Sequence, residues 1–247
     1  MKKAFCFIIC AVLVCVLFAC GESGQNVTTQ KVEATSGTAN KTSDTTTTTT
    51  EITQPYTVIT PDGFTYAVED NGLVVKEYYG TETAVEIPQT IDGKQVVEIG
   101  FEAFKDNNVK SVVVPFGVKK IGAYAFYNSS LENIEIPETV TYIGNNAFSY
   151  TDLTQFESPL GISTISFELF SFCDSLETVI LGSNIDEIQE GAFAFCQSLE
   201  SVYIPSSVEY ISDDAFEGWF IGMMLYGEDN SYVQQYAKDN GMEFELI

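Results

Sequence analysis

The 247-residue sequence predicts a β-rich repeat solenoid of about six coils, each 22–23 residues long. Three features predict it. An isoleucine recurs at successive intervals of 22, 22, 22, 23 and 23 residues. An Ala-Phe or Leu-Phe pair begins four residues after each isoleucine, and an apolar "LxxIxI"-like segment lies beyond that pair. One such unit has too few apolar groups to fold alone, so neighbouring coils must stack and share a continuous core. The recurring isoleucines are Ile99, Ile121, Ile143, Ile165, Ile188 and Ile211.

Each coil is expected to contain a tight turn followed by a short strand. The small residue before the phenylalanine lets the turn pack closely, while the ring fills the core. The pairs are Ala103-Phe104, Ala125-Phe126, Ala147-Phe148, Leu169-Phe170, Ala192-Phe193 and Ala215-Phe216. In the strand segment, residues such as Leu131, Ile134 and Ile136 point inward and form ladders along the stack. Proline or glycine ends most of these strands, at Pro115, Pro137, Pro159, Gly182 and Pro205.

Both ends of the repeat carry signals for caps. The stretch "FTYAVEDNGLVVKEYYG" alternates apolar residues around Asn71-Gly72, which predicts a β-hairpin over the first coil. The final stretch, "NSYVQQYAKDNGMEFELI", predicts a short helix with Asn230 or Ser231 as its N-cap and Gly241 as its stop, followed by a last strand. Such caps cover the core and the open strand edges that a solenoid would otherwise expose.

The N-terminus resembles an export signal. Lys2 and Lys3 precede an uninterrupted apolar run at 4–18, as in secretory signal peptides. The run ends in "LFAC", which resembles the lipobox of bacterial lipoproteins, where cleavage before the cysteine is coupled to its lipidation. We therefore expect a signal peptide at 1–19 and a lipid on Cys20. The alternative is an uncleaved signal anchor, because the run approaches the length that spans a bilayer.

A Thr- and Ser-rich segment separates this signal from the repeats. Residues 20–55 include "TSGTANKTSDTTTTTTEITQP" and have few large apolar side chains. Such a segment cannot bury enough surface to fold, so it predicts a disordered tether. The repeat domain then occupies 56–247.

Composition excludes several classes of function. The chain has 35 acidic residues and 11 basic ones, all lysine, and its net charge of −24 disfavours nucleic-acid binding and docking on anionic lipid through a basic patch. It has no histidine, which removes Ser-His and Cys-His nucleophile pairs and His-containing zinc sites. Hydrolysis by two carboxylates stays open but needs a cleft, which a solenoid does not obviously supply. We expect no enzymatic activity and no cofactor.

The repeat pattern can be written "VxxIGxxAFxxCxSLxxVxIPxxV", and it resembles the BspA-type leucine-rich repeats of bacterial surface proteins. The stretches "IGAYAFYNSSLENIEIPETV" and "IQEGAFAFCQSLESVYIPSSV" match it almost letter for letter. The resemblance runs from about Tyr56 to the C-terminus. It implies a leucine-rich repeat solenoid that acts in adhesion or recognition. The departures are mild: the glycine after the isoleucine is kept at Gly100, Gly122 and Gly144 but becomes Ser166, Gln189 and Ser212.

The candidate binding residues are the strand positions that point away from the core. They are expected to line one solvent-facing sheet, with Met223 and Leu225 continuing the series. Its C-terminal end is unusually apolar, with Trp219 and Phe220 nearby, and exposed apolar clusters often mark binding sites. For those two aromatic residues the alternative is packing against the C-terminal cap. The candidate residues are Asn133, Glu135, Gln155, Glu157, Thr178, Ile180, Ser201 and Tyr203.

Two other features have a structural interpretation that we prefer. Cys173 and Cys196 occupy the same offset in adjacent coils and are expected to be small buried residues, although neighbouring coils could bring them within disulfide range. Acidic clusters near Glu69, Ser212 and Gly227 lack the alternating oxygen ligands of a calcium loop, so we expect solvated turns rather than a metal site.

The sequence therefore predicts a lipid-anchored, non-catalytic surface protein on the outer side of the bacterial cytoplasmic membrane. The resemblance implies a protein or glycoprotein ligand on a host or neighbouring cell, and we expect a monomer whose only membrane contact is its lipid anchor. A second hypothesis is a carbohydrate or cell-envelope binding module, in which Tyr203, Tyr210 and Trp219 stack on sugars. A carboxylate-based hydrolase is the third and weakest hypothesis.

Overall fold

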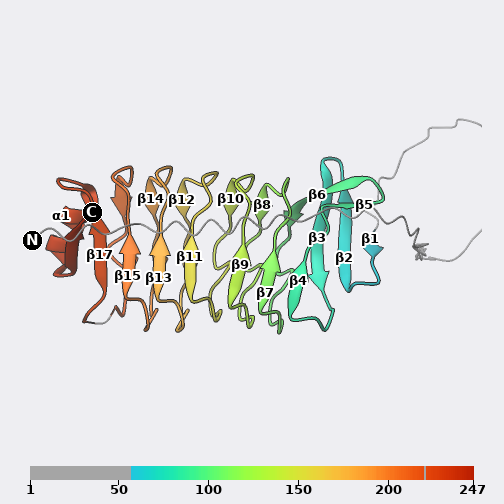
Figure 1. Ribbon diagram of the computed structural model, residues 1–247, viewed down its shortest axis with the longest axis horizontal. Coiled ribbons are helices and arrows are strands. Elements are labelled where there is room, and N and C mark those ends of the chain that lie inside the picture. Colours follow the sequence, from blue (N-terminus) through green and yellow to red (C-terminus); the bar gives the residue numbers. More distant parts are fainter. Residues whose placement is uncertain (1–56, 220) are drawn as a thin grey trace, which may run out of the picture.

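The protein is an elongated β-solenoid whose coils stand side by side along its long axis (Figure 1). The computed structural model describes residues 57–219 and 221–247. The predicted signal peptide at 1–19, lipidation site at Cys20 and tether at 20–55 lie outside these residues, as does Phe220. Within the described residues, no helix has the length and apolar character needed to cross a membrane.

An antiparallel hairpin closes the N-terminal end, as predicted. The strands at this end are β1 (Thr57–Ile59), β2 (Phe64–Glu69), β3 (Gly72–Tyr78), β5 (Thr90–Ile91) and β6 (Lys94–Ile99). β1, β2 and β3 pair antiparallel in that order, and β3 then runs parallel to β6 and so leads into the stack of coils. The rings of Phe64 and Tyr78 lie 6.1 Å and 5.4 Å from the ring of Phe104, so the hairpin covers the first turn of the core.

Two rows of short parallel strands run along the solenoid, which confirms the predicted fold class. The front row consists of β4 (Ala84–Glu86), β7 (Ser111–Val113), β9 (Asn133–Glu135), β11 (Gln155–Glu157), β13 (Thr178–Ile180), β15 (Ser201–Tyr203), β17 (Met224–Gly227) and β18 (Glu243–Leu246). The back row consists of β6, β8 (Lys120–Ile121), β10 (Tyr142–Ile143), β12 (Thr164–Ile165), β14 (Glu187–Ile188) and β16 (Tyr210–Ile211). Within a row, paired residues are one coil apart, as Val179 and Val202 are.

A column of phenylalanine rings fills the corner between the two rows. Phe104, Phe126, Phe148, Phe170, Phe193 and Phe216 are each at most 2% exposed. Successive ring centroids lie 4.8, 5.6, 5.6, 5.5 and 5.2 Å apart in a stacked arrangement. The repeat places one ring per coil at the same offset, so parallel stacking of coils becomes parallel stacking of rings.

A helix and a strand close the C-terminal end, also as predicted. α1 (Tyr232–Asn240) begins after Ser231, whose side chain accepts a hydrogen bond from the amide of Gln234. It ends at Gly241, whose φ of 67° is in the left-handed region that favours glycine. β18 then pairs in parallel with β17 and extends the front row by one strand.

The front row is not one continuous sheet, and this corrects the expectation of a single solvent-facing sheet. β4, β7 and β9 form a three-stranded sheet, and β11, β13, β15, β17 and β18 form a separate five-stranded one. The back row is interrupted at the next position, between β10 and β12. The corner between the rows stays closed on both sides of this interruption, because the amide of Phe126 donates to Ala147 and that of Phe148 to Leu169. We call the interruption the split.

Candidate binding surface and groove

The eight predicted binding residues all lie on front-row strands. Five are exposed and three are half-buried. The exposed ones are Asn133, Glu135, Gln155, Glu157 and Ile180; the half-buried ones are Thr178, Ser201 and Tyr203. The split separates the first two from the other six, so the residues lie on two sheets rather than on one.

The expectation that Met223 and Leu225 continue this surface was wrong. Both are buried, at 1% and 0% exposure. Ser201 pairs with Met224 and Tyr203 with Tyr226, because the last coils are 23 residues long and the strand begins one residue later than a 22-residue spacing gives. A shift of one residue moves every side chain of a strand to the opposite face.

The C-terminal part of the front row carries an apolar and aromatic surface. Tyr203 and Tyr226 stack with ring centroids 4.5 Å apart and planes 11° from parallel. Burial, followed by the neighbouring Tyr203, raises the pKa of Tyr226 above its ordinary value. Ile180 lies one strand away from Tyr203 and is 44% exposed. These three side chains form a neutral surface on an otherwise acidic protein.

The three aromatic residues of the carbohydrate hypothesis do not come together. Tyr203 lies on β15 in the front row, whereas Tyr210 lies on β16 in the back row. Trp219 is half-buried and packs against the hydrophobic core. One face of Tyr203 is already covered by Tyr226. The structure therefore does not form a shared sugar-stacking platform from them.

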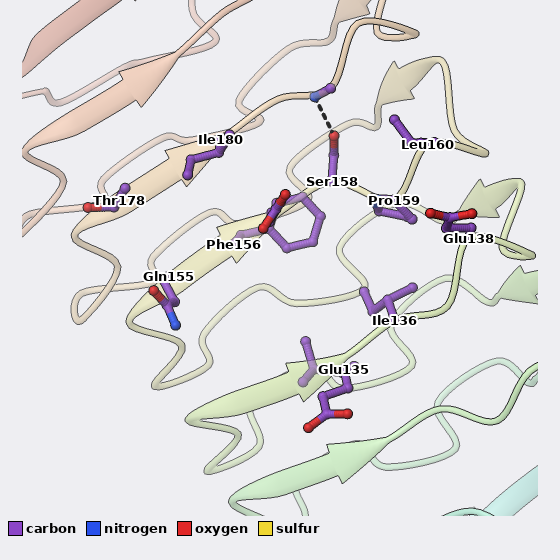
Figure 2. A pocket seen from close by; sticks show the side chains of 13 residues that line it. Glu135, Ile136, Glu138, Gln155, Phe156, Ser158, Pro159, Leu160, Thr178 and Ile180 are labelled. Atoms are coloured by element: carbon purple, nitrogen blue, oxygen red, sulfur yellow. Dashed lines mark hydrogen bonds between the residues drawn. The ribbon is translucent and has the colours of Figure 1, made fainter. Parts of the chain in front are cut away.

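A groove with a volume of about 590 Å³ opens at the split. Its walls come from β9 with the residues after it, from β11, and from β13 (Figure 2). Ile134 and Ile136 line it and are half-buried, whereas their counterparts one coil earlier, Val112 and Val114, are 0% and 3% exposed. The split thus uncovers apolar side chains that the regular stack buries.

Two departures from the strand pattern occur at the split. Phe156 stands where other coils have valine, isoleucine or leucine, and its ring leans toward the following coil, 4.6 Å from Phe170. Ser158 replaces an apolar residue, and its hydroxyl accepts a 2.7 Å hydrogen bond from the amide of Gly182 in the following coil (Figure 2). Both side chains bind the β11 coil to its C-terminal neighbour. Sequence reasoning missed the groove, although these two letters were the available signal.

The groove is lined with carboxylates, and its lining includes no lysine side chain. Glu135, Glu138 and Glu157 contribute to its walls. The ion pairs found among the described residues are Lys105–Glu102, Lys110–Glu132 and Lys120–Glu98, so none of the three groove carboxylates has an ion-pair partner there. In the described part of the chain, no cluster of three or more Cys, Asp or Glu side chains has a metal-binding arrangement.

Cys173 and Cys196 are free thiols buried in the core. Each donates a 3.0 Å hydrogen bond to a backbone carbonyl of the preceding coil, from Cys173 to Phe148 and from Cys196 to Phe170. Burial raises the pKa of the Cys173 thiol to about 11, with partial opposition from the Thr151 hydroxyl, and raises that of Cys196 as well. Both thiols are therefore neutral hydrogen-bond donors that tie coils together.

A second aromatic column, not anticipated from the sequence, runs along the turn corner. Tyr150, Phe172 and Phe195 stack with centroids 4.7 Å and 4.8 Å apart, and Tyr127 meets Tyr150 edge-on at 5.4 Å. These rings cover one another's faces, so they stabilise the stack of coils and leave mainly their edges to solvent. The signal was the aromatic residue two positions after Phe148, Phe170 and Phe193.

The model of the BspA type leucine rich repeat region matches six copies over residues 97–220. The chain belongs to the BspA-type leucine-rich repeat family. Leucine-rich repeat solenoids are as a rule non-catalytic binding scaffolds with extended binding surfaces. No curated protein is significantly similar to the chain in sequence.

Solved structures of bacterial leucine-rich repeat proteins share this fold. A leucine-rich repeat protein of T. pallidum is 26% identical with a TM-score of 0.57, over 74% of this chain and 95% of its own. A leucine-rich cell surface protein of Faecalibacterium prausnitzii is 25% identical with a TM-score of 0.55, over 70% of this chain and 55% of its own. The pneumococcal vaccine antigen PcpA has a TM-score of 0.60 at 22% identity, over 71% of this chain and 50% of its own, and so supports the fold alone.

Proposed function

We propose that this protein is a lipid-anchored cell-surface binding module whose front row recognises a protein or glycoprotein on a host or neighbouring cell. The observation that carries the proposal is that each coil has two kinds of position, one repeated and one variable. The repeat keeps the residues that fill the core, while the outward strand positions differ from coil to coil, as Asn133 and Glu135 differ from Ser201 and Tyr203. A rigid scaffold with variable outward positions is what specific recognition requires.

The neutral surface made by Ile180, Tyr203 and Tyr226 is the part of the front row best suited to anchor a ligand. Tyrosine is enriched at the energetic centres of protein interfaces because it combines a large apolar area with a polar group and few rotatable bonds. The acidic surroundings add long-range steering toward a basic partner patch. A protein ligand fits this arrangement better than a sugar, since the aromatic residues of the carbohydrate hypothesis lie on different sides of the solenoid.

Surface location rests on two supports. The cell surface protein of Faecalibacterium prausnitzii shares the fold at 25% identity. The N-terminal "LFAC" stretch supports lipidation of Cys20 after removal of residues 1–19. Mass spectrometry of the protein from bacterial membranes checks this part: we expect a diacylated or triacylated peptide that begins at Cys20, and a peptide that still contains Met1 would contradict it.

The binding proposal is tested with the soluble repeat domain, screened against immobilised extracellular-matrix proteins and a glycan array. We expect binding to a protein or glycoprotein that weakens at least tenfold in Tyr203→Ala and in Ile180→Ala. Tyr142→Ala is the matched control, because Tyr142 is 48% exposed but lies in the back row. Binding that survives both front-row changes, or that Tyr142→Ala reduces equally, would show that the ligand uses another surface.

A further inference from the structure

The split leaves strand backbone without partners on both sides of the groove. On β9, the carbonyl of Glu135 accepts from the amide of Val114, and so faces β7. On β11, the amide of Ser158 donates to the carbonyl of Ile180, and so faces β13. Neighbouring residues of a strand direct their backbone groups to opposite sides. The amide and carbonyl of Ile134, and those of Glu157, therefore face the groove, where no strand pairing joins β9 to β11.

Open strand edges inside a solenoid are unusual, because its architecture normally pairs each strand with the next coil. Elsewhere in the front row every described neighbour from β4 to β9 and from β11 to β18 is paired. Unpaired edges are templates on which a further extended segment can add its own backbone hydrogen bonds. The groove presents two such edges that run in the same direction, with an apolar floor between them.

We propose that this groove binds an extended peptide segment of a partner protein, with lysine or arginine at alternate positions. The inference rests on the proposed function, since it names one site and one class of partner for the same front row. The segment adds a strand between β9 and β11, pairing with the backbone of Ile134 on one side and of Glu157 on the other. Its inward side chains are apolar and cover Ile134 and Ile136, which are half-buried in the free protein.

Charge complementarity determines which side chains the bound segment carries on its outward face. Glu135 on β9 and Glu157 on β11 are exposed, occupy outward positions on the two facing strands, and have no ion-pair partner among the described residues. A residue placed between them in an added strand lies within cross-strand reach of both, where opposite charges stabilise and like charges destabilise. Glu138 adds a third carboxylate to the wall. An acidic segment would meet repulsion from all three and from the net charge of −24.

The dimensions of the groove agree with a peptide. Its volume of about 590 Å³ lies within the range of ligand sites. It has apolar side chains at the bottom and carboxylates at the rim, and strand alternation places the two kinds of side chain on opposite faces of an extended ligand. Of its lining, Ile134 and Ile136 are the residues whose counterparts one coil earlier, Val112 and Val114, are covered by the next coil.

Hydrogen–deuterium exchange of the ligand-free domain tests the open edges first. We expect the amides of Ile134 and Glu157 to exchange at least tenfold faster than that of Val179, which lies in the closed five-stranded sheet. Equal protection would mean that β9 and β11 pair in solution, and would overturn the inference whatever the domain binds.

Binding is then measured by fluorescence anisotropy with an acetylated heptapeptide of alternating lysine and valine. Two control peptides accompany it: one with glutamate in place of lysine, and one N-methylated at every second residue, which removes the backbone donors of one edge. We expect binding of the first peptide alone, with new protection of the Ile134 and Glu157 amides. The double variant Glu135→Lys/Glu157→Lys should weaken binding at least tenfold.

The matched control is Glu200→Lys/Glu209→Lys, which changes the net charge equally at two exposed carboxylates away from the groove. We expect it to change the affinity less than threefold. Equal weakening by the two double variants, or undiminished binding of the N-methylated peptide, would mean non-specific charge attraction and overturn the inference. If the peptide does not bind but a protein ligand still binds through Tyr203, the groove proposal fails and the proposed function stands. If the peptide binds and no protein ligand depends on Tyr203, which does not line the groove, the assigned front-row surface fails instead.

Discussion

The column of phenylalanine rings predicts that Phe148→Ala is strongly destabilising. Phe148 is fully buried, with stacked neighbours 5.6 Å away on both faces. Truncating a buried phenylalanine costs about 3–5 kcal/mol through lost transfer free energy and the cavity left behind. Each stacked pair adds about 0.5–1.5 kcal/mol beyond area burial, so the loss should lie in the upper half of that range.

A urea titration followed by circular dichroism measures this loss. With an m-value of about 2 kcal/mol/M, a loss of about 4 kcal/mol lowers the midpoint by about 2 M. Phe116→Ala is the control, because that ring is 67% exposed and its removal should change the stability by less than about 0.5 kcal/mol. A loss below about 1 kcal/mol for Phe148→Ala would refute the argument that this column carries the core.

Three further predictions concern the thiols and the split. Folding raises the pKa of Cys173 from 9.0 to about 11, so the contribution of its neutral thiol to the free energy of unfolding is complete below pH 9. This contribution falls by about 1.4 kcal/mol per pH unit as the pH rises toward 11. Urea titrations at pH 8 and 10.5 should show the decline, and Cys173→Ala should lessen it. Gly161→Ala should lower the stability by about 1–3 kcal/mol, because the added Cβ would lie 2.1 Å from the Val140 carbonyl oxygen. Gly182→Ala should lower it less than half as much, because the atom nearest to its added Cβ is 3.3 Å away. Ser166→Ala should lower the melting temperature by several degrees, because the Ser166 hydroxyl donates a hydrogen bond to the Ile143 carbonyl across the split. An unchanged melting temperature would show that this hydrogen bond contributes nothing to stability.

The repeat made most of the fold predictable. Six copies of one pattern fix the ring column, the inward ladder and the parallel pairing together, since each copy confirms the position of the others. The caps were predictable for a local reason: Asn71-Gly72 and Ser231 with Gly241 are signals that need no tertiary context. The resemblance to the family then followed from the same letters that build the core.

The surface was less predictable, because it depends on register and on single departures from the pattern. Met223 and Leu225 were assigned to the wrong face since the spacing of the last coils differs by one residue from that of the first ones. The split was missed because a repeat averages over its copies, whereas Phe156 and Ser158 act only in one of them. The residues least informative about the fold are therefore the ones that shape the groove.

The split lies at the boundary between two ways of stacking coils. Before it, Gly122 and Gly144 approach the preceding coil so closely that an added Cβ would lie 2.8 Å and 2.5 Å from its backbone. After it, Gln189 and Ser212 have side chains at that position and still donate their amides to the preceding coil, at 2.9 Å and 3.0 Å.

Each mode of stacking is regular by itself, but the step between them is not. Ser166 is the first residue with a side chain at this position, and its preceding coil is of the close-packed glycine kind. Its hydroxyl, rather than its amide, reaches the Ile143 carbonyl, at 2.5 Å. The contacts on either side of Ser166 remain close: the amide of Asn146 donates to Phe167, and a Cβ added to Gly161 would lie 2.1 Å from the Val140 carbonyl oxygen. The change from glycine to serine thus coincides with the break in the back row, whereas Phe156 and Ser158 mark the break in the front row, where the proposed ligand binds.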